Sequence, residues 1–156
     1  HVLSGGQTGT DLAKYEDYLA SRVREVKRSA IERLVRLYGS NAVRIVDLME
    51  RDPAKARPLA HDSVLTAAEV EYNVKHEMAM TLTDVLERRT RLLLWEIGCG
   101  VSGVEPAAAV MAELLGWDAT RRDREVADYC NLVDQIRRPK DMPTPVDDEE
   151  GQEAHA

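Results

Sequence analysis

The chain has 156 residues, of which 44% are hydrophobic and 31% charged, so it is long enough for one domain with a buried core but not for two. Its formal net charge of −7 argues against nucleic acid as the main partner, because phosphate binding requires a basic surface. Phe is absent and only 4% of residues are aromatic, which favours an aliphatic core of packed helices over a β-sandwich.

The sequence shows neither a membrane-spanning segment nor a secretion signal. No apolar run approaches the roughly 20 residues of a transmembrane helix, and no signal peptide is recognisable. Cys99 and Cys130 have no partners at metal-ligand spacing, so we interpret them as reduced thiols of a cytosolic protein.

The chain opens on a Gly-rich segment, residues 1–9, which lacks the spacing of a phosphate-binding loop and is predicted to be a linker. Because the first residue is His1 rather than Met, we expect the chain to be a piece of a longer protein, with an upstream domain before the linker. A first helix is then predicted from Thr10 or Asp11 to about Val26, since apolar residues recur there at spacings of three and four.

Two shorter helices follow. Ser29 and Glu32 have the spacing of a capping box, and Gly39 stands where a helix end favours a left-handed residue. Asn41 is expected to start the next helix, which ends at Asp52 because the following proline disfavours helical backbone in the residue before it.

Capping residues also predict where the central helices begin. Thr66 with Glu69 predicts the start of one helix. Thr81 with Asp84 predicts the start of another, which is expected to run without interruption to the break at Gly98.

The last two helices are expected to begin at Glu105, before a proline, and at Asp118, with Gly116 closing the first of them. Residues 139–156 are rich in proline and acid and are predicted to form a disordered tail. The predicted fold is therefore all-α: a compact orthogonal or irregular bundle of about six to seven helices over residues 10–138, with no internal repeat.

The first candidate chemical function is metal binding. Glu69, Asn73, His76 and Met80 share one helical face, but a zinc site needs three or four ligands and no Glu-x-x-His is repeated on a second helix. We therefore predict no metal ligand. No nucleophile stands in a recognisable motif either, so no catalytic residue is assigned.

Glu77, Arg88 and Arg89 are the most suggestive charged residues. If the chain bends at Thr81, the carboxylate of Glu77 could form an ion pair with either guanidinium group. The structural interpretation is a pair that fixes how two helices cross. The functional interpretation is an arginine pair that holds a phosphate or a flavin. Trp95 and Trp117 each end an apolar run and are interpreted as core or interface anchors.

An ordered set of short motifs resembles a known family. Residues 69–72 (EVEY), 76–79 (HEMA), 81–86 (TLTDVL) and 88–92 (RRTRL) resemble the C-terminal helical domain of the FAD-dependent, aerobic glycerol-3-phosphate dehydrogenases and alpha-glycerophosphate oxidases. Outside this stretch, the resemblance extends to the linker at 3–6, the helix end at 34–40 and the segment 111–118.

The resemblance implies a parent enzyme that oxidises sn-glycerol 3-phosphate to dihydroxyacetone phosphate with FAD and passes electrons to quinone, or to oxygen in the oxidases. The family's flavin and substrate residues lie in upstream domains, so no catalytic or cofactor-binding residue carries over and no cofactor is expected in this fragment. What carries over is a structural or docking role for Glu77, Arg88 and Arg89.

The partner implied is the flavin and substrate domain of the same chain, with a homodimer as a further option. The implied location is the cytoplasm, with peripheral attachment to the inner face of the cell membrane through the parent. The alternative is a stand-alone helical module that binds a protein partner through an exposed apolar groove.

Overall fold

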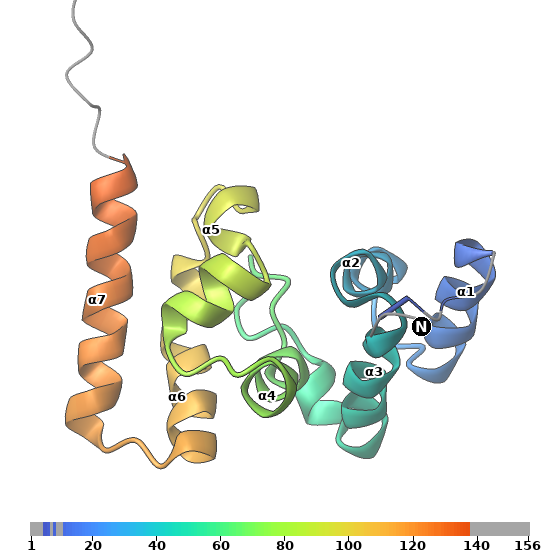
Figure 1. Ribbon diagram of the computed structural model, residues 1–156, viewed down its shortest axis with the longest axis horizontal. Coiled ribbons are helices and arrows are strands. Elements are labelled where there is room, and N and C mark those ends of the chain that lie inside the picture. The colour runs from blue at the N-terminus through green and yellow to red at the C-terminus, as the bar shows by residue number, and fades with distance from the viewer. Residues whose placement is uncertain (1–4, 7, 9–10, 138–156) are drawn as a thin grey trace, which may run out of the picture.

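The computed structural model describes residues 5, 6, 8 and 11–137, and these residues form seven α-helices (Figure 1). No strand occurs among them, apart from a single bridge between Pro58 and Thr66. The prediction of an all-α fold with about seven helices is confirmed. The helices are α1 (Leu12–Arg22), α2 (Arg28–Tyr38), α3 (Ala42–Arg51), α4 (Ala67–His76), α5 (Leu92–Trp95), α6 (Val104–Leu115) and α7 (Ala119–Arg137).

Short irregular helices connect these elements. Three are 3-10 segments: η1 (Gly39–Asn41), η2 (Pro53–Ala56) and η4 (Val101–Gly103). The fourth, η3 (Asp84–Arg89), is a π-helix. The tail expected at 139–156 lies outside the described residues, as does most of the linker expected at 1–9.

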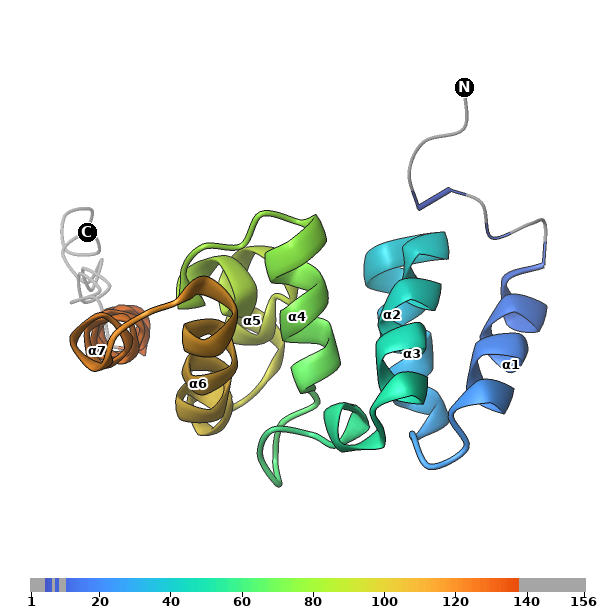
Figure 2. The same ribbon diagram turned by 90° about the horizontal axis from the view of Figure 1, so that it is seen from below.

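The helices form two hydrophobic cores that lie side by side along the long axis of the molecule (Figures 1 and 2). The first core is enclosed by α1, α2 and α3, and its central residues include Leu19, Ile31 and Ile45. The second is enclosed by α4, η3, α6 and α7, and includes Leu86, Met111 and Tyr129. The aliphatic composition is thus used to fill two small cores rather than a single large one.

Helix α4 belongs to both cores. Ala68 and Tyr72 pack into the first core, whereas Val70 packs into the second. Because both faces of the helix are covered, even its polar residues Glu69 and Asn73 are fully buried. α4 is therefore the element that joins the two halves, and its polar side chains must find partners inside the protein.

Several predicted caps are confirmed. The side chains of Asp11, Thr66 and Asp118 accept hydrogen bonds from main-chain N–H groups in the first turns of α1, α4 and α7. The cap expected at Ser29 is wrong: α2 begins at Arg28, and Glu32 pairs with the Arg28 side chain instead of closing a capping box. The first helix also ends earlier than expected, at Arg22.

Gly39 is required by a close approach of two backbones. It has a φ of 56°, and a Cβ atom at this position would lie 1.9 Å from the main-chain oxygen of Gly5. The same Gly5 oxygen accepts a hydrogen bond from the Ser40 N–H at 2.7 Å. Any side chain at residue 39 would therefore push away the segment that enters the domain.

A buried polar network joins α2 to α4 at the seam between the two cores. The Tyr38 hydroxyl donates to Glu69 Oε1 at 2.9 Å and accepts from the Asn73 side-chain amide at 3.0 Å. Arg33 forms an ion pair with the other carboxylate oxygen of Glu69. Burial raises the pKa of Tyr38 well above its ordinary value, and the negative charge of Glu69 adds to the shift.

We expect Glu69→Ala to lower the free energy of unfolding by about 3–5 kcal/mol, because the partly buried Arg33 guanidinium loses its carboxylate and the Tyr38 hydroxyl loses one of its two partners. The matched control is Glu32→Ala, which removes an exposed i,i+4 pair with Arg28 and should cost less than about 1 kcal/mol. Urea denaturation of both variants measures the difference. Equal losses would contradict the role assigned to the network.

Candidate functional site

The segment between α4 and α5 holds the charged residues predicted as a site. Its bend is fixed by Thr81 and Asp84, which form the capping box that the sequence indicates. The Thr81 hydroxyl accepts from the Asp84 N–H at 3.1 Å, and Asp84 Oδ2 accepts from the Met80 and Thr81 N–H groups, each at 3.0 Å. The chain therefore turns sharply after α4 and starts a new helical run at a defined residue.

This new run is not the continuous α-helix that the sequence predicts. Residues Asp84–Arg89 form the π-helix η3, and the Thr90 N–H donates to the Val85 carbonyl five residues earlier. The Thr90 hydroxyl donates to the same carbonyl at 2.7 Å. Arg91 then adopts a left-handed conformation, with a φ of 56°, before α5 begins. Such wide turns and positive φ values are costly and cluster at functional positions.

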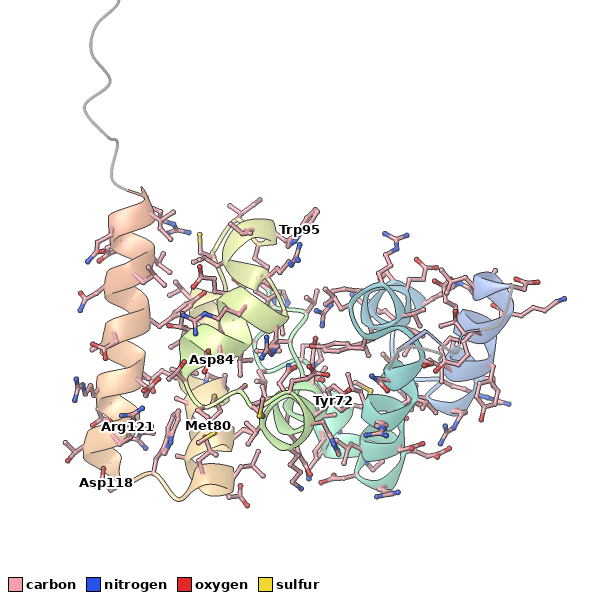
Figure 3. The ribbon with its side chains drawn as sticks, in the orientation of Figure 1. Tyr72, Met80, Asp84, Trp95, Asp118 and Arg121 are labelled. Carbon is pink, nitrogen blue, oxygen red and sulfur yellow. The ribbon has the colours of Figure 1, made fainter. Side chains whose placement is uncertain are left out.

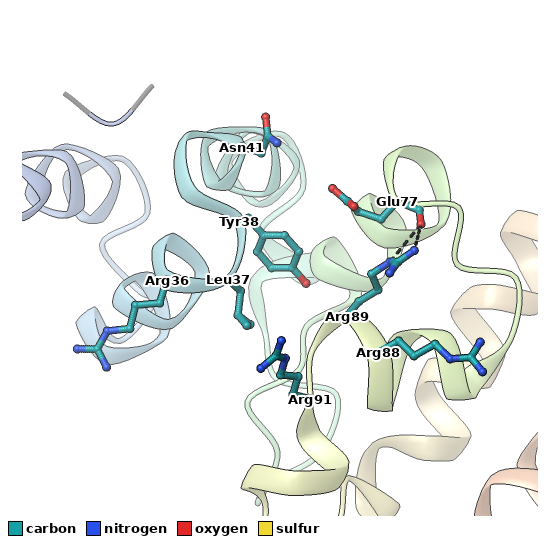
Figure 4. A pocket seen from close by; sticks show the side chains of 8 residues that line it. All are labelled: Arg36, Leu37, Tyr38, Asn41, Glu77, Arg88, Arg89 and Arg91. Atoms are coloured by element: carbon teal, nitrogen blue, oxygen red, sulfur yellow. Dashed lines mark hydrogen bonds between the residues drawn. The ribbon is translucent and has the colours of Figure 1, made fainter. Parts of the chain in front are cut away.

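Glu77 and Arg89 are brought together, but not as the expected carboxylate–guanidinium pair. Arg89 donates from Nε and Nη2 to the main-chain oxygen of Glu77, at 3.2 and 2.8 Å (Figure 4). The Glu77 carboxylate instead accepts from the Tyr72 hydroxyl at 3.1 Å. Burial, reinforced by this carboxylate, raises the pKa of Tyr72 to about 12.

Arg88 does not reach Glu77 in the structure. Its guanidinium group pairs with Asp84 at 2.5 Å, one turn earlier on the same helical run, and its side chain is 62% exposed. Figure 4 shows it extending away from Arg89. The sequence could not separate the two arginines, because the π-helix changes the direction in which each side chain leaves the backbone.

An open pocket of about 430 Å³ lies between the end of α2 and this segment (Figure 4). Eight residues line it: Arg36, Leu37, Tyr38, Asn41, Glu77, Arg88, Arg89 and Arg91. We call it the arginine pocket. Four of the lining residues are arginines and only one is acidic, so the lining carries a local positive charge, although the chain as a whole is acidic. Its chemistry suits carboxylate or phosphate groups presented by another surface.

The four residues that share the Glu69 face do not converge on one point. Glu69 and Asn73 are part of the buried network around Tyr38, His76 stacks against the Tyr72 ring, and Met80 is exposed (Figure 3). Within the part of the chain that the structure describes, no three His, Cys, Asp or Glu side chains are grouped to hold a metal ion. In the same part, no helix combines the length and apolar character that crossing a bilayer requires.

Trp95 is not a core residue, in contrast to one of the two roles predicted for it. Its side chain is 77% exposed and projects from the end of α5 (Figure 3). Trp117 is partly buried against the second core, and the guanidinium group of Arg121 lies over its ring. Periodicity placed Trp95 inside a long helix that the structure interrupts at Arg91.

We expect Arg89→Ala to destabilise the domain by about 1.5–3 kcal/mol, because the main-chain oxygen of Glu77 loses two charge-assisted donors. Arg88→Ala removes only an exposed i,i+4 pair and should cost no more than about 0.5 kcal/mol. Chemical denaturation of the two variants provides the comparison. A larger loss for Arg88→Ala would show that the structural roles are reversed.

The stability contributed by Asp84 should depend on pH. Burial raises the pKa of Asp84, but hydrogen bonds from Met80, Thr81 and Arg88 outweigh burial and lower the pKa below its ordinary value. A carboxyl group with a lowered pKa stabilises the fold fully above its unfolded pKa of about 3.9, and this stability is lost as pH falls through the folded pKa.

We therefore expect Asp84→Asn to be less stable than the unmodified chain at pH 7, with the difference narrowing below about pH 4. Urea denaturation across this pH range measures the difference. Curves that stay parallel down to the lowest pH at which both proteins fold would contradict the prediction.

Comparison with known proteins identifies the domain. Residues 1–122 match the family described as the C-terminal domain of alpha-glycerophosphate oxidase. The probable glycerol-3-phosphate dehydrogenase of Encephalitozoon cuniculi is 30% identical over 70% of this chain, and glycerol-3-phosphate dehydrogenase 2 of Mycobacterium tuberculosis is 32% identical over 67%. The aerobic glycerol-3-phosphate dehydrogenase of Staphylococcus epidermidis is 26% identical over 90% of the chain.

The match covers only part of each relative. It spans 18% of the first two proteins and 26% of the third. No solved structure gives a significant match to the chain. The matched family nevertheless covers most of the helical region, including α4, the π-helix and the arginine pocket. The chain therefore belongs to the family of C-terminal domains found in glycerol-3-phosphate dehydrogenases and alpha-glycerophosphate oxidase.

Proposed function

We propose that this chain is the accessory helical domain of an FAD-dependent enzyme that oxidises sn-glycerol 3-phosphate to dihydroxyacetone phosphate and passes electrons to quinone. The observation that carries the proposal is the match to the C-terminal domain of relatives that are named glycerol-3-phosphate dehydrogenase and of which the matched segment spans only 18% to 26%. The domain itself supplies structure and docking rather than catalytic groups.

The arginine pocket and the π-helix support a docking role. Arg88 is mostly exposed, and its pair with Asp84 is of the exposed i,i+4 kind that adds little to stability. Such a residue is free to contribute to an interface at little cost to the domain. The proposed partner is the flavin and substrate domain of the same polypeptide, which would present carboxylate or main-chain oxygen atoms to the guanidinium groups. Peripheral attachment to the inner face of the membrane belongs to the whole enzyme in this proposal.

Glu77 and Arg89 have a supporting part in the proposal. Arg89 holds the main chain at Glu77, at the turn where α4 ends, so it fixes the position of the pocket wall. A domain–domain interface of ordinary size needs such a rigid surface, because each ordered side chain adds to the entropic cost of docking. In this proposal Arg88 contacts the partner domain, and its neighbour Arg89 holds the pocket wall in position.

In the full-length enzyme, we expect Arg88→Glu to weaken docking by about 2 kcal/mol, as loss of an interface hot spot does, and to lower glycerol-3-phosphate-dependent dye reduction. The matched control is Arg124→Glu on α7, because Arg124 also forms an exposed i,i+4 pair, with Asp128 at 3.6 Å. The control should retain activity, and both variants of the isolated domain should melt near the unmodified temperature.

The outcomes separate the two parts of the proposal. Equal activity of both variants would exclude the Arg88 face as the docking surface, while leaving the parent activity intact. A full-length protein that binds FAD but does not oxidise glycerol 3-phosphate would overturn the proposed activity itself.

A further inference from the structure

A second hollow adjoins the arginine pocket and has a different character. It has a volume of about 480 Å³ and lies between α2 and the segment from Thr90 to Glu96. We call it the Trp95 groove. It shares Arg36, Leu37 and Arg91 with the arginine pocket, so the two hollows form one continuous surface along the seam between the two cores. Its lining is mainly apolar, with Trp95 on one side.

The groove contains cationic groups that lack anionic partners. Among the described residues, neither Arg36 nor Arg91 forms an ion pair or a hydrogen bond through its side chain. Arg33, which also lines the groove, is already paired with Glu69. The guanidinium groups of Arg36 and Arg91 are therefore the ones that would stabilise a negatively charged ligand here.

The carboxylates of the groove are already engaged. Glu32 pairs with Arg28, and Glu96 Oε1 accepts from the Ser63 hydroxyl and the Val64 N–H, at 3.2 and 3.1 Å. They therefore do not neutralise Arg36 or Arg91. Arg and Trp are the residue types enriched at the centres of binding surfaces, because each offers a large contact area together with specific polar or ring interactions.

The end of α7 lies beside the segment that carries Trp95. The Arg137 side chain donates from Nη2 to the main-chain oxygen of Ile97 at 2.7 Å, and Ile97 is two residues beyond Trp95. The ten residues from Arg137 to Asp147 can span up to about 33 Å when extended. A segment that begins beside Ile97 therefore has ample length to enter the groove.

The charge of residues 139–156 is opposite in sign to that of the arginines in the groove. Residues 139–156 contain six carboxylate side chains and a single Lys, with four acidic residues in succession at Asp147, Asp148, Glu149 and Glu150. Carboxylates attached to the same chain also have a high effective concentration at the groove, which a separate partner would lack. Charge, chain length and starting point thus all favour the same occupant.

We propose that residues 147–150 bind within the same chain in the Trp95 groove, with their carboxylates on Arg36 and Arg91 and the preceding residues crossing the Trp95 ring. The tail then covers the surface next to the arginine pocket in an intramolecular contact. This inference does not depend on the proposed function, since it requires only residues of this chain.

The test uses the two tryptophans as reporters. Trp95 and Trp117 are the only tryptophans in the chain, so an amide-correlation NMR spectrum contains one indole N–H signal from each. We compare the 156-residue chain with a chain ending at Arg138 and with the quadruple variant D147N/D148N/E149Q/E150Q. A Trp95→Phe variant assigns the signals.

We expect the Trp95 signal to shift equally on truncation and on neutralisation, while the Trp117 signal stays in place. High salt should reproduce the shift, because exposed ion pairs are screened. A peptide of residues 139–156 added to the truncated chain should restore the original position, and should fail to do so with the double variant Arg36→Ala/Arg91→Ala.

Two results would overturn the proposal. An unchanged Trp95 signal in the truncated and neutralised chains would show that the tail does not occupy the groove. A Trp95 position that changes on dilution of the full chain would show that the occupant comes from a second copy. The Trp117 signal monitors folding, so a general loss of structure in any variant is recognised from both signals moving together.

Discussion

The ion pair between Arg33 and Glu69, with Tyr38 and Asn73 beside it, is the interaction on which the arrangement of the domain depends. The aliphatic composition yields two small cores, and neither core alone determines how it is placed against the other. Apolar contact is not directional, whereas a buried carboxylate with two partners, one of them bonded in turn to Asn73, has few acceptable geometries. The network therefore fixes the register of α2 against α4 and, with it, the shape of the seam.

Both hollows described above lie along that seam, and arginine residues line each of them. The arginine pocket and the Trp95 groove both open along it, and both take residues from α2 and from the segment after α4. A small shift of one half against the other would change both hollows together. Stability and recognition are thus linked in this domain: the residues that hold the halves together are buried directly beneath the residues that face outward.

The sequence predicts the parts of this structure that depend on neighbouring residues. Thr66, Asp118 and Gly116 act as caps as expected, because a cap needs only the backbone of the next turn or the freedom of a left-handed residue. The site was predicted less well. The bend at Thr81 occurs as expected, but the chain leaves the α-helical path at Asp84, so Arg88 and Arg89 do not point as they would from a regular helix. The exposed position of Trp95 follows from a second interruption, at the left-handed residue Arg91 before α5.

The π-helix also has a consequence for how the domain tolerates changes in length. A π-turn contains one residue more than the α-helical turn it replaces, so the segment Asp84–Arg89 resembles a helix that has accepted a single inserted residue. Deleting one residue there would restore regular geometry and rotate everything before it by about 100° relative to α5. The regular helix would then lose the hydrogen bonds from Arg89 to the main-chain oxygen of Glu77. In this domain, the extra residue of the π-turn is what brings Arg89 to the main-chain oxygen of Glu77.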